Sequence, residues 1–597
     1  MYTDEEISSV LRDVRTVAIV GASSNWKRPS YFAAKYLQQK GYRVIPVNPA
    51  EAAKGAEILG ERVYASLSDV PGPIDMVDIF RGSDAALGVT REALALAASK
   101  GIRVVWMQLG VRNETARAEA EAAGLRVIMD RCPKIEFSRL FGELGWHGFD
   151  SGVISSRRAR AGAAGPPGGP RFTGLETKAI HSGQRVDDTT GARITPIFQT
   201  ASYVFEDVEH AASLFNLQTF GNVYSRLGNP TVAALEEKLA ALEGGRGATC
   251  AASGHAAQLL VLFTLLRPGD RFVASKNLYG GSIAQFRKAG ERFGWHCDFV
   301  DLEDRAAVRA LLEAPRCKLL WAESLANPGG VVSDIEWLSA ECKRVRVPLC
   351  IDNTLATPAL CRPGELGADI VCHSTTKFLS GHGNALGGAV VDIGRFDWSC
   401  DKGKYPSLSE PEPAYHGLTF HESFGDLALT TALHAIALRD LGPAMSPFNA
   451  FLTSMGVETL PLRMERHVRN ALEVAAFLKQ HPKVAYVSYA GLKESPFHER
   501  MLRLTRGRGA GSVFTFGLKG GFADGVRFVE SLHLFSHLAN VGDTRSLVLH
   551  PGSTTHRQLS EEQRRAAGAG DEVIRLSIGL ESAHDLLLDL EQALAKL

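Results

Sequence analysis

The sequence predicts an α/β protein made of two separately folded units joined by a linker. Over residues 1–150, short apolar runs alternate with stretches of helical period, as in a doubly wound (Rossmann-like) parallel sheet. A second and longer alternation begins near Leu175 and continues through the rest of the chain. Between them, residues 151–172 are rich in glycine, proline and alanine, which is typical of a flexible linker. At roughly 150 residues per domain, the length predicts three or four domains.

The composition excludes several classes of protein. Lys+Arg and Asp+Glu both number 66, so the net charge is zero and nothing indicates a nucleic-acid or membrane partner. The N-terminus is acidic and lacks the apolar stretch of a signal peptide, and the longest apolar run, Ala256 to Leu266, is too short to cross a bilayer. Nine cysteines without a C-x-x-C pair fit a reducing compartment, so we expect a cytoplasmic protein without disulfides or a zinc site.

The first unit begins with the buried strand 16–20, which ends at a turn of small residues, 21–24. Pro29 opens and Gly41 closes a helix, and 43–47 forms the second strand. The same criteria predict strands at 74–80, 102–107 and 125–129, and helices at 84–100 and 113–123.

A dinucleotide does not fit the first unit, because G-x-G-x-x-G is absent and the second strand ends at Asn48-Pro49 without a carboxylate. The unit resembles the small CoA-binding domain family in Val20-Gly21-Ala22-Ser23, Val47-Asn48-Pro49 and the run 129–134. The resemblance implies that a CoA pyrophosphate is held at the turn and the following helix start, where N–H groups favour anions. A degenerate domain that binds nothing is the alternative. The implied CoA residues are Gly21, Ala22, Ser23 and Asn48.

The second unit is organised around His373-Ser374-Thr375-Thr376-Lys377, which follows a predicted strand at 368–372. Ser374 and Thr376 lie on the same side of an extended segment, so both hydroxyls can reach one phosphate. The amine of Lys377 can bond to a cofactor aldehyde. These are the requirements of a pyridoxal phosphate (PLP) site, although an exposed lysine in a turn explains this stretch alone equally well.

Three further features support a PLP site. Asp352 ends an apolar strand, where a carboxylate needs a partner such as a protonated pyridine nitrogen. Gly254 and His255 open a helix whose N–H groups can bind a phosphate. Tyr279 precedes two glycines and can stack on the pyridine ring. An ordinary strand-to-helix turn and a core tyrosine explain the last two features equally well.

Residues 173–597 resemble the Cys/Met-metabolism family of PLP-dependent enzymes, which has the transferase fold type I. The resemblance implies a PLP-binding arm and large domain at 173–423 and a smaller α/β domain at 424–597. The arm is expected to be extended over 177–183 and 195–200. The motifs that carry the resemblance are Tyr224-Ser225-Arg226-Leu227-Gly228-Asn229-Pro230-Thr231, Glu323-Ser324-Leu325-Ala326-Asn327-Pro328, Asp352-Asn353-Thr354, Ser374-Thr375-Thr376-Lys377, Asn540-Val541-Gly542-Asp543 and His550-Pro551-Gly552-Ser553-Thr554-Thr555-His556.

The resemblance also implies a role for each candidate residue. Lys377 binds the cofactor covalently and moves protons, Asp352 pairs with the pyridine nitrogen, and Tyr279 stacks on the ring. Arg575 binds the substrate carboxylate, for which a guanidinium fork is suited. The remaining implied contacts are Gly254, His255, Ser374 and Thr376 to the phosphate, Asn327 beside the ring, Asn540 near the substrate carboxylate, and Tyr224 and Arg226 to the phosphate and substrate of a neighbouring subunit.

Two features point to the O-acetylhomoserine sulfhydrylases within the family. Gly281 and Ser282 stand where methionine γ-lyases usually carry a cysteine, and residues 402–420 resemble a longer insertion of the sulfhydrylases. Aromatic residues of this insertion could close over a substrate. The implied reaction replaces the acetate of O-acetyl-L-homoserine with sulfide and gives L-homocysteine in a homo-oligomer, a dimer of dimers. A cystathionine γ-synthase, a methionine γ-lyase and a CoA-responsive regulatory protein are the alternatives. His533 and His537 lack the acid of an H-E-x-x-H motif, so we expect no metal site.

Overall fold

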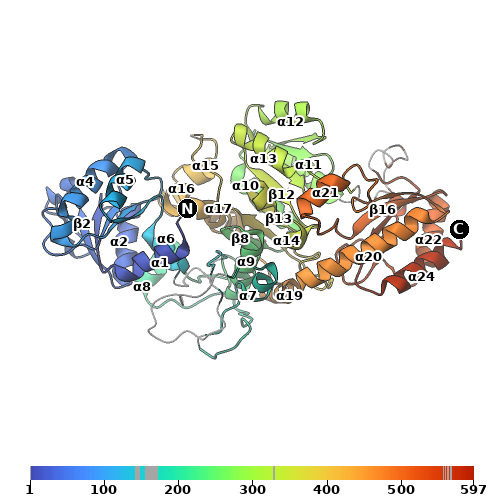
Figure 1. The fold of residues 1–597 in the computed structure, drawn as a ribbon, viewed down its shortest axis with the longest axis horizontal. Coiled ribbons are helices and arrows are strands. Elements are labelled where there is room, and N and C mark those ends of the chain that lie inside the picture. Colours follow the sequence, from blue (N-terminus) through green and yellow to red (C-terminus); the bar gives the residue numbers. More distant parts are fainter. Residues whose placement is uncertain are drawn as a thin grey trace.

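The protein is described here by a computed structural model. The strands form three large sheets and one two-stranded ribbon within the described residues (Figure 1). The first sheet lies at one end of the molecule, the largest in the middle and the third at the other end. The predicted α/β fold is confirmed, whereas the predicted linker falls mostly outside the described residues. Those are residues 2–140, 148–152, 154, 172–187, 189–326, 330–401, 403–555, 557, 560, 562, 564 and 568–597.

The N-terminal domain is a doubly wound sheet of five parallel strands in the order β2-β1-β5-β6-β7. Its strands are apolar and buried because helices cover both faces. A helix that the sequence reading missed begins after a capping box in which Thr3 and Glu6 bond each other's backbone. The elements are α1 (Asp4–Asp13), β1 (Thr16–Val20), α2 (Pro29–Gln39), β2 (Arg43–Val47), α3 (Pro49–Ala52), β3 (Glu57–Ile58), β4 (Glu61–Arg62), β5 (Met76–Ile79), α4 (Ser83–Lys100), β6 (Val104–Met107), α5 (Glu114–Ala122), β7 (Arg126–Ile128) and α6 (Pro133–Leu140).

The central sheet has seven strands in the order β10-β9-β11-β12-β13-β14-β8, and only β14 runs antiparallel to its neighbours. The carboxyl ends of β12 and β13 therefore lie side by side, which is where an open parallel sheet binds its ligand. The elements are β8 (Gly247–Ala251), α10 (Gly254–Leu265), β9 (Arg271–Ser275), α11 (Gly280–Phe293), β10 (His296–Val300), α12 (Arg305–Leu312), β11 (Cys317–Glu323), α13 (Ile335–Arg344), β12 (Leu349–Asp352), α14 (Thr357–Leu360), β13 (Ile370–His373) and β14 (Gly388–Asp392).

The segment before the central sheet differs from the expected extended arm. Residues 175–181 form the helix α7 (Leu175–His181), so the expectation for 177–183 is wrong. This helix packs on α9 (Pro230–Glu243), where the ammonium of Lys238 donates to the carbonyl of Ala179 at 2.8 Å. This buried contact stabilises a helical turn that the local sequence does not predict. Residues 195–200 contain neither helix nor strand, and α8 (Val208–Phe215) follows them.

Helices connect the central sheet to the third sheet. The helices between Phe420 and Leu441 pack against the core of the central sheet. The expected domain boundary at residue 424 stays a prediction. These helices are α16 (Phe420–Phe424), α17 (Ala428–Ala432), the π-helix η5 (Leu433–Leu438) and α18 (Arg439–Leu441), preceded by α15 (Pro406–Ser409).

The C-terminal domain is a five-stranded sheet in the order β15-β16-β19-β18-β17, and the long helix α20 runs alongside it (Figure 1). Its apolar side chains continue into the core of the central domain, so the two domains share one cluster. The elements are α19 (Pro447–Glu458), α20 (Leu460–Gln480), β15 (Val484–Ser488), α21 (His498–Thr505), β16 (Val513–Leu518), α22 (Phe522–Ser531), β17 (Ser536–His537), β18 (Leu547–Leu549), β19 (Val573–Ser577) and α24 (Ala583–Leu594).

A short segment after the N-terminal domain extends the central sheet. The N–H of Ala248 donates to the carbonyl of Gly148 at 2.8 Å, and the N–H of Asp150 donates to the carbonyl of Arg246 at 2.9 Å. Phe149 forms an antiparallel bridge with Gly247 at the start of the edge strand β8. Residues 148–150 therefore tie the N-terminal part of the chain to the central sheet.

No helix within the described ranges has the length and apolar character needed to cross a membrane.

Candidate active site

A cavity of about 220 Å³ lies at the carboxyl ends of β12 and β13. The N-terminus of α10 and the middle of β19 close it from two other sides. The structure thus brings together residues that are more than 300 positions apart in the sequence. Of the predicted site residues, Gly254, His255, Tyr279, Asp352, Ser374, Thr376, Lys377, Asn540 and Arg575 all line this cavity.

One end of the cavity has the groups that bind a phosphate. Ser253 caps α10 by accepting the N–H of Ala256 at 3.1 Å, which leaves the first N–H groups of the helix directed toward the cavity edge. Gly254 is required here, because a Cβ at this position would lie 2.8 Å from the Cβ of Ser374. The hydroxyl of Thr376 is held by Gly387, whose N–H donates to it at 3.0 Å. This end therefore fits the phosphate of PLP.

Asp352 supplies the carboxylate that a pyridine nitrogen requires. Its Oδ1 accepts the hydroxyl of Thr354 at 2.5 Å and the N–H of the same residue at 3.0 Å. Burial raises the pKa of Asp352, and the hydrogen bonds from Thr354 and the nearby His373 act in the opposite direction. A buried carboxylate of this kind is stabilised by a cationic partner in the cavity, which the protonated ring of PLP would be.

A buried glutamate that the sequence reading missed ties the strands beneath Asp352. Oε1 of Glu243, at the end of α9, lies 2.6 Å from Nε2 of His373 and accepts the side-chain amide of Asn353 at 2.9 Å. Glu243 and His373 have fully buried side chains. Because Asn353 follows β12 and His373 ends β13, one carboxylate joins the two strand ends that carry the site.

Asn540 contacts both Lys377 and Arg575. Nζ of Lys377 donates to Oδ1 of Asn540 at 2.6 Å, and Nη2 of Arg575 donates to the backbone carbonyl of Asn540 at 3.1 Å. Burial, and to a smaller extent the positive charge of Arg575, lowers the pKa of Lys377. Burial also lowers the pKa of Arg575 to about 10. The lowered pKa of Lys377 favours its uncharged amine, which is the form that bonds to an aldehyde and accepts a proton.

Tyr279 is held at its backbone and open at its ring. Its N–H donates to Oε1 of Glu323 at 2.6 Å, a contact that the sequence reading missed although it quoted the Glu323 motif. The ring lies 6.0 Å from that of His255 at an interplanar angle of 29°. Half of the side chain is exposed to the cavity side, so one ring face remains available for stacking.

A family model supports this site over the whole second unit. The model described as "Cys/Met metabolism PLP-dependent enzyme" matches residues 176–595. The chain belongs to this family. A second model, described as "CoA binding domain", matches residues 15–138.

Three relatives of the family share the same part of the chain. The O-acetyl-L-homoserine sulfhydrylase 1 of Thermus thermophilus is 47% identical over 422 residues, which is 70% of this chain and 100% of the relative. The O-acetyl-L-homoserine sulfhydrylase of Leptospira meyeri is 46% identical over 440 residues, 71% of this chain and 97% of the relative. A crystal structure of a putative O-acetylhomoserine (thiol)-lyase from Campylobacter jejuni is 37% identical with a TM-score of 0.68, covering 70% of this chain and 99% of that one. That structure carries an N'-pyridoxyl-lysine-5'-monophosphate residue.

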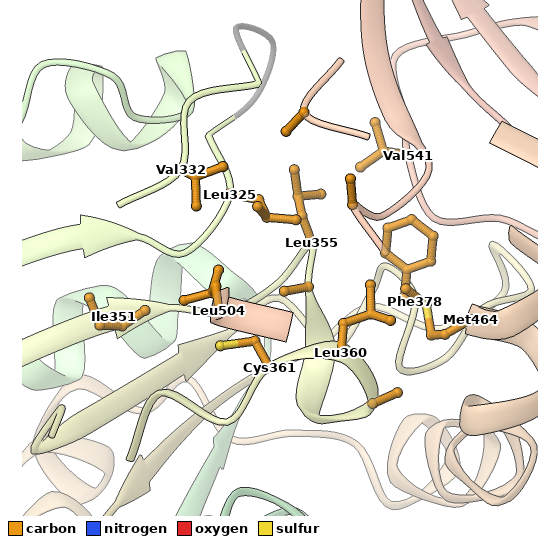
Figure 2. Close-up of a cluster of buried hydrophobic side chains, with 14 of the residues drawn as sticks. Leu325, Val332, Ile351, Leu355, Leu360, Cys361, Phe378, Met464, Leu504 and Val541 are labelled. Carbon is orange, nitrogen blue, oxygen red and sulfur yellow. The ribbon is translucent and has the colours of Figure 1, made fainter. Parts of the chain in front are cut away.

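The C-terminal domain holds the residue after the family's lysine. Phe378 is buried next to Met464 of α20, as Figure 2 shows. The guanidinium of Arg463 donates to the carbonyl of Phe378 at 2.8 Å and to that of Gly456 at 2.6 Å. Burial lowers the pKa of this arginine to about 10. The C-terminal domain therefore fixes the backbone that carries Lys377.

Three predictions for the family's site fall elsewhere. Tyr224 and Arg226 do not line this chain's cavity, and Nη1 of Arg226 donates to the carbonyl of Arg439 at 2.6 Å. Asn327 lies outside the described residues. The insertion does not reach the cavity over its described residues, since the hydroxyl of Tyr415 donates to the carbonyl of Ala435. Whether it closes over a substrate stays a prediction.

The predicted CoA turn has the expected tight geometry. Gly21 has a φ of +96°, and a Cβ there would lie 2.5 Å from the carbonyl oxygen of Phe80. The side chain of Asn48 donates to the carbonyl of Ala22 at 2.7 Å and accepts the N–H of Ala50, so it joins the turn to the start of α3. Oγ of Ser23 accepts the N–H of Asn25 at 3.2 Å. These contacts shape the turn, and its role in CoA binding stays a prediction.

No group of three or more His, Cys, Asp or Glu side chains in the described part of the chain is placed to hold a metal ion.

Proposed function

We propose that the protein replaces the acetate of O-acetyl-L-homoserine with sulfide and releases L-homocysteine and acetate. The observation that carries this proposal is the convergence of Lys377, Asp352 and Arg575 on one cavity. The sulfhydrylases from Thermus thermophilus and Leptospira meyeri, which match this unit over nearly their full lengths, support the choice of reaction.

PLP would be held by residues at both ends of the cavity. The N-terminus of α10 with Ser374 and Thr376 would bind its phosphate, Asp352 its ring nitrogen and Lys377 its aldehyde carbon. When bound, PLP supplies an electron sink that stabilises negative charge on the substrate's α-carbon.

The residues of the chain then have separate tasks. Arg575 holds the substrate carboxylate with its planar fork and so fixes the α-carbon near Nζ of Lys377. The uncharged amine of Lys377 accepts the α-proton, and the side-chain oxygen Oδ1 of Asn540 keeps that amine in place. Asp352 stays charged and keeps a proton on the ring nitrogen, which maintains the electron sink.

We further propose that the enzyme is a homo-oligomer, a dimer of dimers. Tyr224 and Arg226 do not line the cavity of their own subunit, which supports a role for them in the site of a neighbouring subunit. Two apolar side chains before them are open to solvent, since Val204 is 99% exposed and Val208 is 86% exposed. A second copy of the chain would cover these side chains. The nine free cysteines support a reducing compartment, which we take to be the cytoplasm.

The N-terminal domain is proposed to bind CoA or an acyl-CoA at the turn 21–24 and Asn48. Gly21 adopts its positive φ without strain and lets the backbone approach a pyrophosphate closely. Isothermal titration of the full chain with CoA tests this site, and a Gly21→Ala variant should lose the binding.

The activity test compares nucleophiles. The PLP-loaded protein is incubated with O-acetyl-L-homoserine and either sulfide, cysteine or no nucleophile, and products are identified by mass spectrometry. Homocysteine formed from sulfide as the main product supports the proposal. Cystathionine from cysteine would indicate a cystathionine γ-synthase, and 2-oxobutanoate without a nucleophile would indicate a γ-lyase. No turnover with sulfide, with cysteine or without a nucleophile would refute the enzyme proposal and favour a CoA-responsive regulatory protein.

A further inference from the structure

The N-terminal domain contacts the catalytic unit through Lys35 of α2, which pairs with Glu209, and through the loops at one edge of its sheet. The loop after β1 carries Trp26, whose ring lies 5.4 Å from that of His416. The loop after β6 carries Leu109, which packs so closely on Gly425 that a Cβ there would lie 2.7 Å away. The loop after β7 leads to Lys134, whose Nζ lies 5.6 Å from the ring centre of Phe220. All three loops follow the carboxyl ends of parallel strands, where doubly wound sheets bind their ligands.

Phe220 is the centre of this junction. Its ring lies 5.8 Å from that of Phe149 and 6.4 Å from that of Phe424, in addition to the contact with Lys134. Phe149 is buried and belongs to the same apolar cluster as the helices that Leu109 contacts. The N-terminal domain and the segment 148–150 thus enclose Phe220 from one side and α16 from the other.

The segment that begins at Phe220 leads directly to Tyr224 and Arg226. The Arg226 side chain stacks over the ring of Tyr224 at 5.6 Å and donates to the carbonyl of Arg439. Arg439 in turn donates to the hydroxyl of Tyr415, the neighbour of His416. Two routes of contact therefore join the N-terminal domain to the same two residues, one through Phe220 and one through His416.

A third contact holds the segment from the π-helix η5. Nδ1 of His434 lies 2.9 Å from the carbonyl of Leu227, just after Arg226. The helices that supply His434 and Arg439 follow Gly425 in the chain, which Leu109 of the N-terminal domain contacts. The segment 220–227 is thus supported by elements that pack on the N-terminal domain.

We propose that the N-terminal domain positions the segment 220–227 and thereby completes the PLP-phosphate site of the neighbouring subunit. Phe220 and His416 are the positioning residues through which it acts. The inference rests on the proposed roles of Tyr224 and Arg226. A ligand of the N-terminal domain binds among the loops that contact this segment, so CoA binding changes the affinity of the neighbouring subunit for PLP.

The test measures cofactor affinity in the full chain rather than turnover. Each protein is prepared without cofactor and titrated with PLP and with pyridoxal, which lacks the phosphate. The proteins are the wild type, the single variants Phe220→Leu, His416→Ala and Arg226→Ala, and the two double variants that combine Arg226→Ala with each of the other changes. Phe220→Leu keeps an apolar side chain and so preserves the fold, while His416→Ala changes an exposed residue. Phe522→Leu, in the remote α22, is the matched control for the loss of an aromatic ring.

The expected results concern the phosphate alone. Phe220→Leu and His416→Ala each weaken PLP binding at least about twofold, leave pyridoxal binding unchanged and add nothing in the Arg226→Ala background. Saturating CoA changes the PLP affinity of the wild type but not that of Phe220→Leu. Equal losses for PLP and pyridoxal, or losses that add to that of Arg226→Ala, would refute the inference. An Arg226→Ala variant with unchanged PLP affinity would instead refute the proposed role of Arg226.

Discussion

Replacing Glu243 with alanine should destabilise the catalytic unit and its cofactor site together. The side chain is fully buried, and one oxygen interacts with both His373 and Asn353. Its removal leaves two buried donors without their acceptor, and each such loss costs about 1–3 kcal/mol. We therefore expect Glu243→Ala to lose about 2–6 kcal/mol, the sum of the two losses.

The assay is urea unfolding followed by tryptophan fluorescence, combined with PLP titration. Glu243→Gln keeps an acceptor oxygen in the same place and should lose only about 1–2 kcal/mol. PLP affinity should fall in the order wild type, glutamine variant, alanine variant, because the two strand ends beneath Asp352 and Ser374 lose their tie. Glu313→Ala, which removes an exposed ion pair with Arg344, is the control and should leave the midpoint unchanged. An alanine variant that unfolds at the same midpoint as this control would refute the reasoning.

Three further predictions address ionisable groups of the cofactor site and of the buried core of the N-terminal domain. Asp352→Asn should keep PLP bound through the phosphate end but lower kcat about 100-fold or more, because the ring nitrogen loses its charged partner; bound PLP is checked by absorbance, and an unchanged kcat would contradict the assignment. The rate at which apo-protein takes up PLP should rise with pH, with a midpoint below the ordinary lysine pKa of 10.5, because burial and Arg575 lower the pKa of Lys377. Arg575→Met should move that midpoint upward. Stopped-flow absorbance measures both midpoints, and identical midpoints in the two proteins would count against the role of Arg575. Burial raises the pKa of Asp78 to about 8, so the folded protein keeps a proton that the unfolded chain loses, and stability should fall as pH rises from about 4 to about 8, by a contribution of the order of 5 kcal/mol. Asp78→Asn stays neutral and should flatten this slope in calorimetric melts at several pH values, whereas an equal slope in both proteins would contradict the prediction.

The sequence predicted most of the site because its residues stand next to strand ends. Asp352 and Lys377 follow apolar runs that could only be buried strands, and an ionisable group at that position indicates a ligand. The strands and helices that were predicted in the first unit lie within two or three residues of those observed, because glycine and proline mark several of their ends.

The residues that the sequence reading missed are polar groups whose burial depends on distant elements. Glu243 lies in a helix that contains three other charged residues and would be expected on the surface, yet every residue of α9 is buried. The helix is enclosed by α7, α19 and β8, which the local sequence does not show. The helix α7 was read as extended for the same reason, because its stability comes from its contact with α9.

The pairing of residues 148–150 with β8 has a consequence for how the two halves of the chain can be separated. An exposed edge strand offers free N–H and C=O groups to other chains and so promotes aggregation. A fragment that starts at Leu175 would uncover the edge at Gly247 and Ala248, while one that starts at Gly148 would keep it closed. The end of the N-terminal unit thus belongs, in its backbone pairing, to the sheet of its neighbour.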